Sequence, residues 1–155
     1  MRCRLALYVR ENTRMLRTVL MRVMAIDYGD ARIGMAVSDP TGLICGDAWT
    51  LQEWNAERAA QTICEEAEKR DVHTIVLGLP KNMNGTEGPR AEKSREFKKL
   101  LEEHTDKDII LWDERRTSIE AHAILHNVGK KEKKHRESVD AVAASLILEG
   151  YLNSR

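Results

Sequence analysis

Three carboxylates, each on a different apolar segment, constrain how this chain can fold. Asp27 ends the apolar run at residues 23–26, Glu114 follows a second run at residues 109–112, and Asp140 opens a helical pattern near the C-terminus. An acid at the end of a buried strand lowers stability unless water, a cation or a metal ion compensates its charge. If the three segments converge, their carboxylates form an oxygen-ligand site of the kind that holds Mg²⁺ or Mn²⁺.

The order of the patterns predicts one mixed α/β domain, which 155 residues can form around an ordinary core. The first two strands are expected to form a hairpin, and the nearly all-apolar run at residues 72–77 indicates a central strand. The expected strands are residues 21–28, 32–38, 43–51, 72–77 and 108–112. The expected helices begin after the cap Asn55, at Pro89, at the capping box of Thr117 and Glu120, and at Ser138. The last helix is expected to bury Val139, Val142, Ala143, Leu146, Ile147 and Tyr151.

Composition limits the function classes. Basic and acidic residues number 25 each, so a nucleic-acid partner would have to bind a local basic patch, such as the predicted loop at residues 129–136. Three scattered cysteines without a CxxC pair indicate a reduced, cytoplasmic protein. No apolar run has the length of a membrane span, so no membrane partner is expected.

The first 20 residues differ from the rest, because they hold five arginines and precede Met21, where the first strand begins. We expect an N-terminal extension at 1–20 and the functional domain at 21–155. Three interpretations of the extension stay open: a start codon assigned too early, a basic arm for nucleic acid, or an amphipathic helix packed on the domain.

Four motifs resemble those of the YqgF (RuvX-like) family, in order and in spacing. They are residues 24–39 around Asp27, the Gly78-Leu79-Pro80 segment with Asn84-Gly85, residues 113–118 around Glu114, and residues 140–144 from Asp140. The similarity covers essentially everything from Met21 to the C-terminus. Arg116 departs from the family pattern, which more often has an apolar residue there.

The resemblance implies a ribonuclease H-like fold, with a mixed five-stranded sheet and helices on both faces. It also implies a metal-dependent nuclease of the bacterial cytoplasm, with Asp27, Glu114 and Asp140 as the catalytic and metal-binding positions. The resemblance implies one of two substrates, which are the 5′ end of the small-subunit (16S) ribosomal RNA precursor and a Holliday junction. The first is our expectation and branched DNA is the alternative.

The chemistry of the residues agrees with this expectation. Two divalent ions about 3.5–4 Å apart can activate a water molecule and stabilise the leaving oxygen of a phosphodiester. Asp27 is the best candidate to bridge both ions, with Glu114 and Asp140 each completing one side. Basic residues near these acids are expected to contact phosphates. They are Lys130, Lys131, Lys133, Lys134, Arg136, Arg115 and Arg116. The sequence leaves open whether the protein is a monomer or a homodimer.

Other interpretations compete with this one. Each acid alone has a structural explanation: an Asx turn for Asp27, a surface ion pair for Glu114, a helix-dipole contact for Asp140. The chain also resembles half of a two-domain ATPase, or a non-catalytic nucleic-acid-binding module. His122 and His126 have zinc-ligand spacing but lack an evident third ligand. Asp39 and Asp113 are candidates to orient water or Arg32, and the amides of residues 78–88 are candidates to hold a phosphate.

Overall fold

The computed structural model describes the backbone of residues 21–116 and 133–155, and the side chains of residues 21–115 and 139–155. The chain order is β1 (Arg22–Asp27), β2 (Arg32–Ser38), β3 (Cys45–Gln52), α2 (Ala56–Lys69), β4 (Val72–Leu79), α3 (Pro89–His104), β5 (Asp108–Asp113), the 3₁₀ turn η1 (Glu114–Arg116) and α5 (Lys133–Asn153). The predicted helix opened by Thr117 and Glu120, together with His122 and His126, lies outside the described residues, as do residues 1–20.

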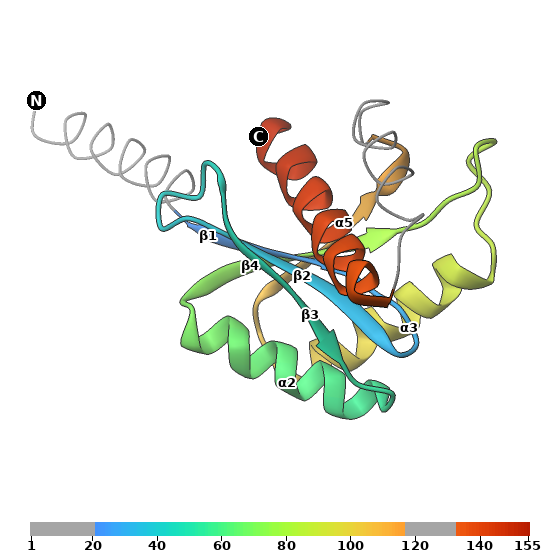
Figure 1. Ribbon diagram of the computed structural model, residues 1–155, viewed down its shortest axis with the longest axis horizontal. Helices are drawn as coiled ribbons and strands as arrows, with labels where there is room; N and C mark the ends of the chain where they lie inside the picture. Colours follow the sequence, from blue (N-terminus) through green and yellow to red (C-terminus); the bar gives the residue numbers. More distant parts are fainter. Residues whose placement is uncertain (1–20, 117–132) are drawn as a thin grey trace, which may run out of the picture.

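The strands form one mixed sheet in the order β3-β2-β1-β4-β5. β2 pairs antiparallel with both β1 and β3, whereas β4 pairs parallel with both β1 and β5. Parallel strands end at the same edge of a sheet, so the carboxyl ends of β1, β4 and β5 lie side by side (Figure 1). The predicted hairpin, the central strand and the mixed sheet are confirmed.

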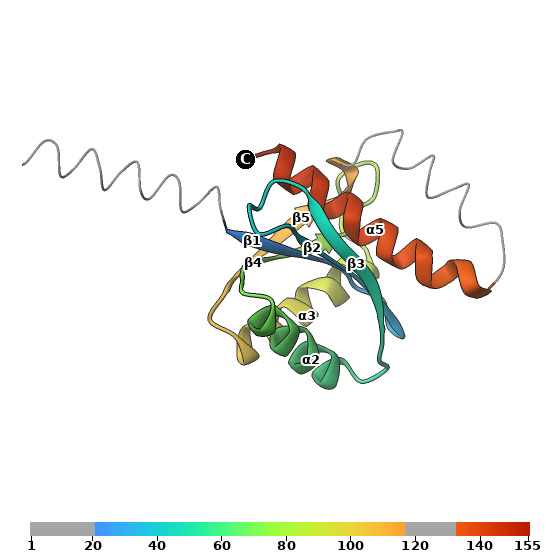
Figure 2. The same ribbon diagram turned by 60° about the vertical axis from the view of Figure 1, so that its left-hand side comes forward.

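Helices cover both faces of the sheet, with α2 and α3 on one face and α5 on the other (Figure 2). Alternate residues of each strand point to opposite faces, which gives two cores. Met24 and Ile26 of β1 belong to the larger core beneath α2 and α3. Val23 and Ala25 belong to the smaller core beneath α5, with Ala144, Ile147 and Leu148 of that helix. The chain therefore buries apolar side chains on both faces of its central strands.

Helix α2 forms where the sequence predicts it. Asn55 caps its first turn by accepting a hydrogen bond from the Arg58 backbone N–H at 3.0 Å. Its apolar stripe is buried against the sheet. Among the described residues, no helix combines the length and apolar character needed to cross a membrane.

Three predicted boundaries are wrong. β3 begins at Cys45, because the Asp39 carboxylate accepts the backbone N–H groups of Thr41, Leu43 and Ile44 and holds residues 39–44 as a loop. β4 extends to Leu79, where it still pairs with Asp113 of β5. α5 begins at Lys133, several residues before the predicted start.

The buried face of α5 also differs from the prediction. Ala144, Ile147 and Leu148 are its buried apolar residues, whereas Val142 and Ala143 are only partly buried. Positions 140, 144, 147 and 151 lie along one stripe of an α-helix, so the face against the sheet includes Asp140.

Candidate active site

Asp27 is the last residue of β1 and points to the face that α5 covers, because it has the parity of Val23 and Ala25. On one side its neighbour in the sheet is Gly34 of β2. On the other side, Ile26 pairs with Leu77 of β4, so the next position beside Asp27 is Gly78. Neighbouring strands lie about 4.8 Å apart, which puts a glycine close to Asp27 on each side.

Glu114 lies over the glycine of β4. It directly follows β5 in η1. A Cβ atom at Gly78 would stand 2.5 Å from Glu114 Oε1 and 2.8 Å from Ile147 Cδ1. The absence of a side chain at Gly78 therefore makes room for the Glu114 carboxylate at the end of β4, next to Asp27.

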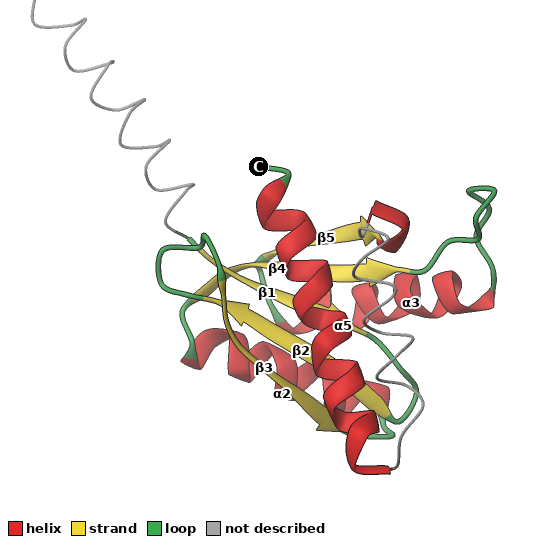
Figure 3. Ribbon diagram, turned by 45° about the horizontal axis from the view of Figure 1, so that its top comes forward, coloured by secondary structure: helices red, strands yellow, loops and turns green. Residues whose placement is uncertain are grey.

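Asp140 lies over the glycine of β2. A Cβ atom at Gly34 would overlap the Asp140 carbonyl oxygen, so α5 rests directly on the sheet at this point (Figure 3). The Asp140 side chain is largely buried, and its Oδ2 atom lies 3.4 Å from Nε of Arg32 on β2. Arg32 thus compensates part of this negative charge. The three predicted acids lie on one face at one edge of the sheet, with Asp27 between the other two.

Burial and mutual repulsion raise the pKa values of two of these acids, Asp27 and Glu114. Burial is the main cause that raises the pKa of Asp27 to about 6; Arg90 lowers this pKa and Asp140 raises it. Burial likewise raises the pKa of Glu114 to about 7, Asp27 raises it further, and Arg90 lowers it. Burial thus favours the protonated form of both carboxyl groups, and a nearby positive charge favours the ionised form. In the described residues, no three His, Cys, Asp or Glu side chains stand close enough together to coordinate one ion.

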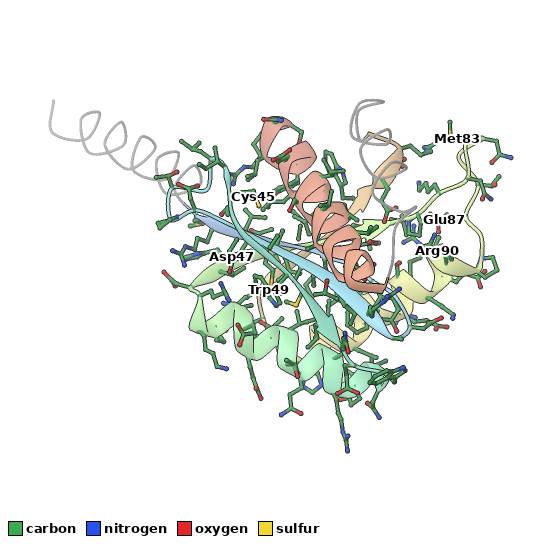
Figure 4. The ribbon with its side chains drawn as sticks, in the orientation of Figure 1. Cys45, Asp47, Trp49, Met83, Glu87 and Arg90 are labelled. Carbon is green, nitrogen blue, oxygen red and sulfur yellow. The ribbon has the colours of Figure 1, made fainter. Side chains whose placement is uncertain are left out.

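Arg90 is a site residue that the sequence reasoning missed. It lies in the first turn of α3 (Figure 4). Its charge lowers the pKa of both Asp27 and Glu114. A cation is unfavourable at a helix N-terminus, where the helix dipole is positive. That conflict, in the sequence Gly88-Pro89-Arg90, was the available signal that this arginine compensates acids elsewhere.

Neither Asp113 nor Asp39 pairs with Arg32, the partner considered for them. Arg115 donates to Asp113 at 2.6 Å, so Asp113 pairs with Arg115. Asp39 lies at the opposite end of β2 from Arg32 and accepts hydrogen bonds from its own loop.

The residues predicted to bind phosphates lie in three places. The basic run was predicted as a loop, but Lys133, Lys134 and Arg136 lie within the first turns of α5. Arg116 ends η1, two residues after Glu114. Lys130 and Lys131 are outside the described residues.

The fold is that of the ribonuclease H-like resolvases. A Thermus thermophilus RuvC, solved in complex with a Holliday junction substrate, superposes with a TM-score of 0.58 over 86% of this chain and 96% of its own, at 12% identity. A Fowlpox virus resolvase in complex with Holliday junction DNA gives a TM-score of 0.51 over 86% of this chain and 98% of its own, at 14% identity. At such identities the likeness concerns the fold, and it confirms the predicted fold class.

Sequence comparison identifies the family. The family model RuvX, described as Holliday junction resolvase, matches residues 21–154, and the chain belongs to this family. A relative from Halothermothrix orenii is 41% identical over 133 residues, covering 86% of this chain and 95% of the relative. A relative from Acetivibrio thermocellus is 43% identical over 143 residues, covering 87% and 97%. Both are named "Putative pre-16S rRNA nuclease". The resemblance seen in the four motifs is confirmed.

Proposed function

We propose that this protein is a nuclease that hydrolyses phosphodiester bonds with the help of divalent metal ions, at a site formed by Asp27, Glu114 and Asp140. The observation that carries the proposal is the position of Asp27, which lies between a glycine beneath Glu114 and a glycine beneath Asp140 on one face of the sheet. The names of the curated relatives and the family description support the same class of reaction.

The donor set fits Mg²⁺ or Mn²⁺. All three side chains offer hard carboxylate oxygens, and burial leaves two of them with raised pKa values that a cation would lower. We propose that Asp27, Glu114 and Asp140 would together hold two such ions. Bound divalent ions supply positive charge for the attacking water and for the leaving oxygen.

The surrounding residues have supporting roles. Arg32 holds the Asp140 carboxylate on the sheet side of α5. Arg90 keeps Asp27 and Glu114 closer to their ionised forms.

We further propose that basic residues near the site bind substrate phosphates: Lys130, Lys131, Lys133, Lys134, Arg136, Arg115 and Arg116. Residues 21–155 would form the nuclease domain, which the family match over residues 21–154 supports. Residues 1–20 would then form an extension outside this domain. We place the activity in the cytoplasm.

The proposed substrate is the 5′ end of the 16S ribosomal RNA precursor, in line with the names of the relatives. The second candidate is branched DNA, favoured by the description of the family model. Purified protein should be assayed on a precursor RNA fragment and on a four-way DNA junction, each with Mg²⁺ and with chelator. Mg²⁺-dependent cleavage of the RNA fragment at the mature 5′ end is the expected result. Cleavage of the junction alone would support the second candidate, and cleavage of neither would contradict both.

A further inference from the structure

The segment between β4 and α3 forms a small hairpin beside the candidate active site. Lys81 and Glu87 form an isolated antiparallel bridge. Inside it, the Asn82 N–H donates to the Thr86 carbonyl and the Gly85 N–H donates to the Asn82 carbonyl, both at 2.9 Å. Gly85 has a φ of +86°, which favours glycine. Hydrogen bonds of the backbone and of the Asn82, Asn84 and Thr86 side chains thus hold this hairpin, residues 81–87, in one defined turn.

Met83 stands at the outer end of the hairpin with 92% of its surface exposed (Figure 4). It is more exposed than the other large apolar side chains that reach solvent in the described part of the chain, Leu43, Ile44 and Trp54. A single exposed apolar residue needs no explanation by itself. Here, however, the side chain is held away from the protein by a hydrogen-bonded turn.

The hairpin is joined to the site at its base. It extends beyond the carboxyl end of β4 (Figure 3), and its first residue, Lys81, is three residues after Gly78, over which the Glu114 carboxylate lies. The Arg115 guanidinium, next in sequence to Glu114, lies 3.4 Å from where a Cβ atom of Gly85 would be. The tip therefore projects from the same edge that carries the three acids.

Charge at the base of the hairpin suits a polyanion. Glu87 accepts two hydrogen bonds of 2.6 Å from Arg95 and lies 3.7 Å from Lys81 Nζ. Asp113 is paired with Arg115. Both acids are thus already compensated by arginines, and Lys81 adds a positive charge. An apolar tip on a positively charged base matches a nucleic-acid strand, whose phosphates are anionic and whose bases offer apolar faces.

The length of the hairpin limits where its tip can act. From Leu79 to Met83, four residues span at most about 13 Å at roughly 3.3 Å per residue. Stacked nucleotides rise about 3.4 Å each along a strand, so this reach covers about four nucleotides. A methionine thioether makes favourable contacts with aromatic rings, and apolar side chains including methionine insert between base steps in known complexes.

We propose that Met83 contacts an exposed nucleobase of the substrate, within about four nucleotides of the bond to be cleaved, and so positions the strand on the site. This inference rests on the proposed nuclease function and adds a substrate-positioning residue to it.

Binding can be measured without cleavage, in chelator, with RNA and DNA oligonucleotides that carry 2-aminopurine at successive positions around the cleavage site. The variants are Met83→Ala, Met83→Phe and, as a matched control, Ile44→Ala. Ile44 is an apolar side chain with 65% exposure in the loop at the opposite end of the sheet. Cleavage by each variant is measured in parallel with Mg²⁺.

For Met83→Ala we expect binding to weaken by about threefold to tenfold, as for the loss of one strong sulfur–aromatic contact. The change in 2-aminopurine fluorescence that accompanies binding of the wild type at one or two positions near the cleavage site should be lost. Met83→Phe should restore both, and Ile44→Ala should match the wild type. Comparison of the RNA with the DNA oligonucleotides shows which kind of nucleic acid supplies the base.

If the wild type binds and cleaves while Met83→Ala behaves identically in both measurements, this inference is wrong and the proposed function stands. If the wild type neither binds nor cleaves any of the oligonucleotides, the proposed function fails and the inference with it.

Discussion

At the scale of single residues, Arg90 shows how one charge adjusts the site. It lowers the pKa of Asp27 and of Glu114, although burial still holds both above their ordinary values. Arg90→Ala should therefore raise both pKa values further, because the carboxylates lose a compensating charge. Titration of the metal-free protein by carboxyl ¹³C NMR measures this. Arg90→Lys keeps the charge and serves as the control; unchanged titrations in Arg90→Ala would contradict the role given to Arg90.

The sequence predicted the three acids but not their surroundings. Asp27, Glu114 and Asp140 were identifiable because each carboxylate stands at the end of an apolar segment or at the start of a helical pattern, where its charge needs compensation. Gly34 and Gly78 were not, because their role depends on which atoms approach them from α5 and η1. Contacts between distant segments leave no periodic signal in a single sequence.

At the scale of elements, the contact between α5 and β2 holds the site together. A Cβ atom at Gly34 would overlap a backbone atom of Asp140, which cannot move without moving the helix. Gly34→Ala should therefore lower the free energy of unfolding by about 1–3 kcal/mol, as for other overpacked sites, and should also reduce cleavage. Thermal denaturation and the cleavage assay measure the two effects.

Gly150, which lies in α5, offers a matched control for the substitution of Gly34 in β2. There a Cβ atom would stand 3.4 Å from the Trp112 ring, a contact with side-chain atoms that can adjust. Alanine also favours helix over glycine by up to about 1 kcal/mol. Gly150→Ala should keep both stability and activity. If Gly34→Ala were equally well tolerated, α5 would not rest on β2 as described.

Most elements followed from periodicity and caps, and the errors have physical causes. The basic run before the last helix looked like a solvated loop, yet lysine, arginine and glutamate are good helix formers, and residues 133–138 belong to α5. The apolar run predicted a strand only to residue 77, but pairing with Trp112 keeps Gly78 in β4. Pairing between strands overrode the local preference there.

At the scale of the whole molecule, the raised pKa values predict how stability depends on pH. Unfolded, Asp27 and Glu114 ionise near their ordinary pKa values of 3.8 and 4.5, whereas folded they ionise at about 6 and about 7. The folded state therefore binds more protons in between. The free energy of unfolding contributed by these groups should fall as pH rises from about 4 to about 7, and level off above that.

Other acids have the opposite effect, so a comparison is needed. Hydrogen bonds from arginines lower the pKa of Glu66 and of Asp113, which stabilises the fold above their ordinary pKa values and loses this effect in acid. Urea denaturation of the metal-free wild type and of Asp27→Asn/Glu114→Gln, from pH 4 to 8, isolates the site. The double variant should gain stability relative to the wild type as pH rises. A constant difference would contradict the raised pKa values, and added Mg²⁺ should reduce the difference.

The most direct test of the proposed site is the dependence of cleavage on Mg²⁺ in Asp27→Asn. An amide is a poor, uncharged ligand of nearly the same shape, so a proposed metal ligand is lost while the fold remains. Asp30→Asn is the matched control, because Asp30 is an exposed acid nearby that pairs with Lys93 at 2.7 Å. We predict that Asp27→Asn cleaves on the order of a hundredfold or more slowly at every Mg²⁺ concentration. It should melt at or above the metal-free wild-type temperature, and Asp30→Asn should match the wild type. Cleavage by Asp27→Asn at the wild-type rate would contradict the assignment of this site.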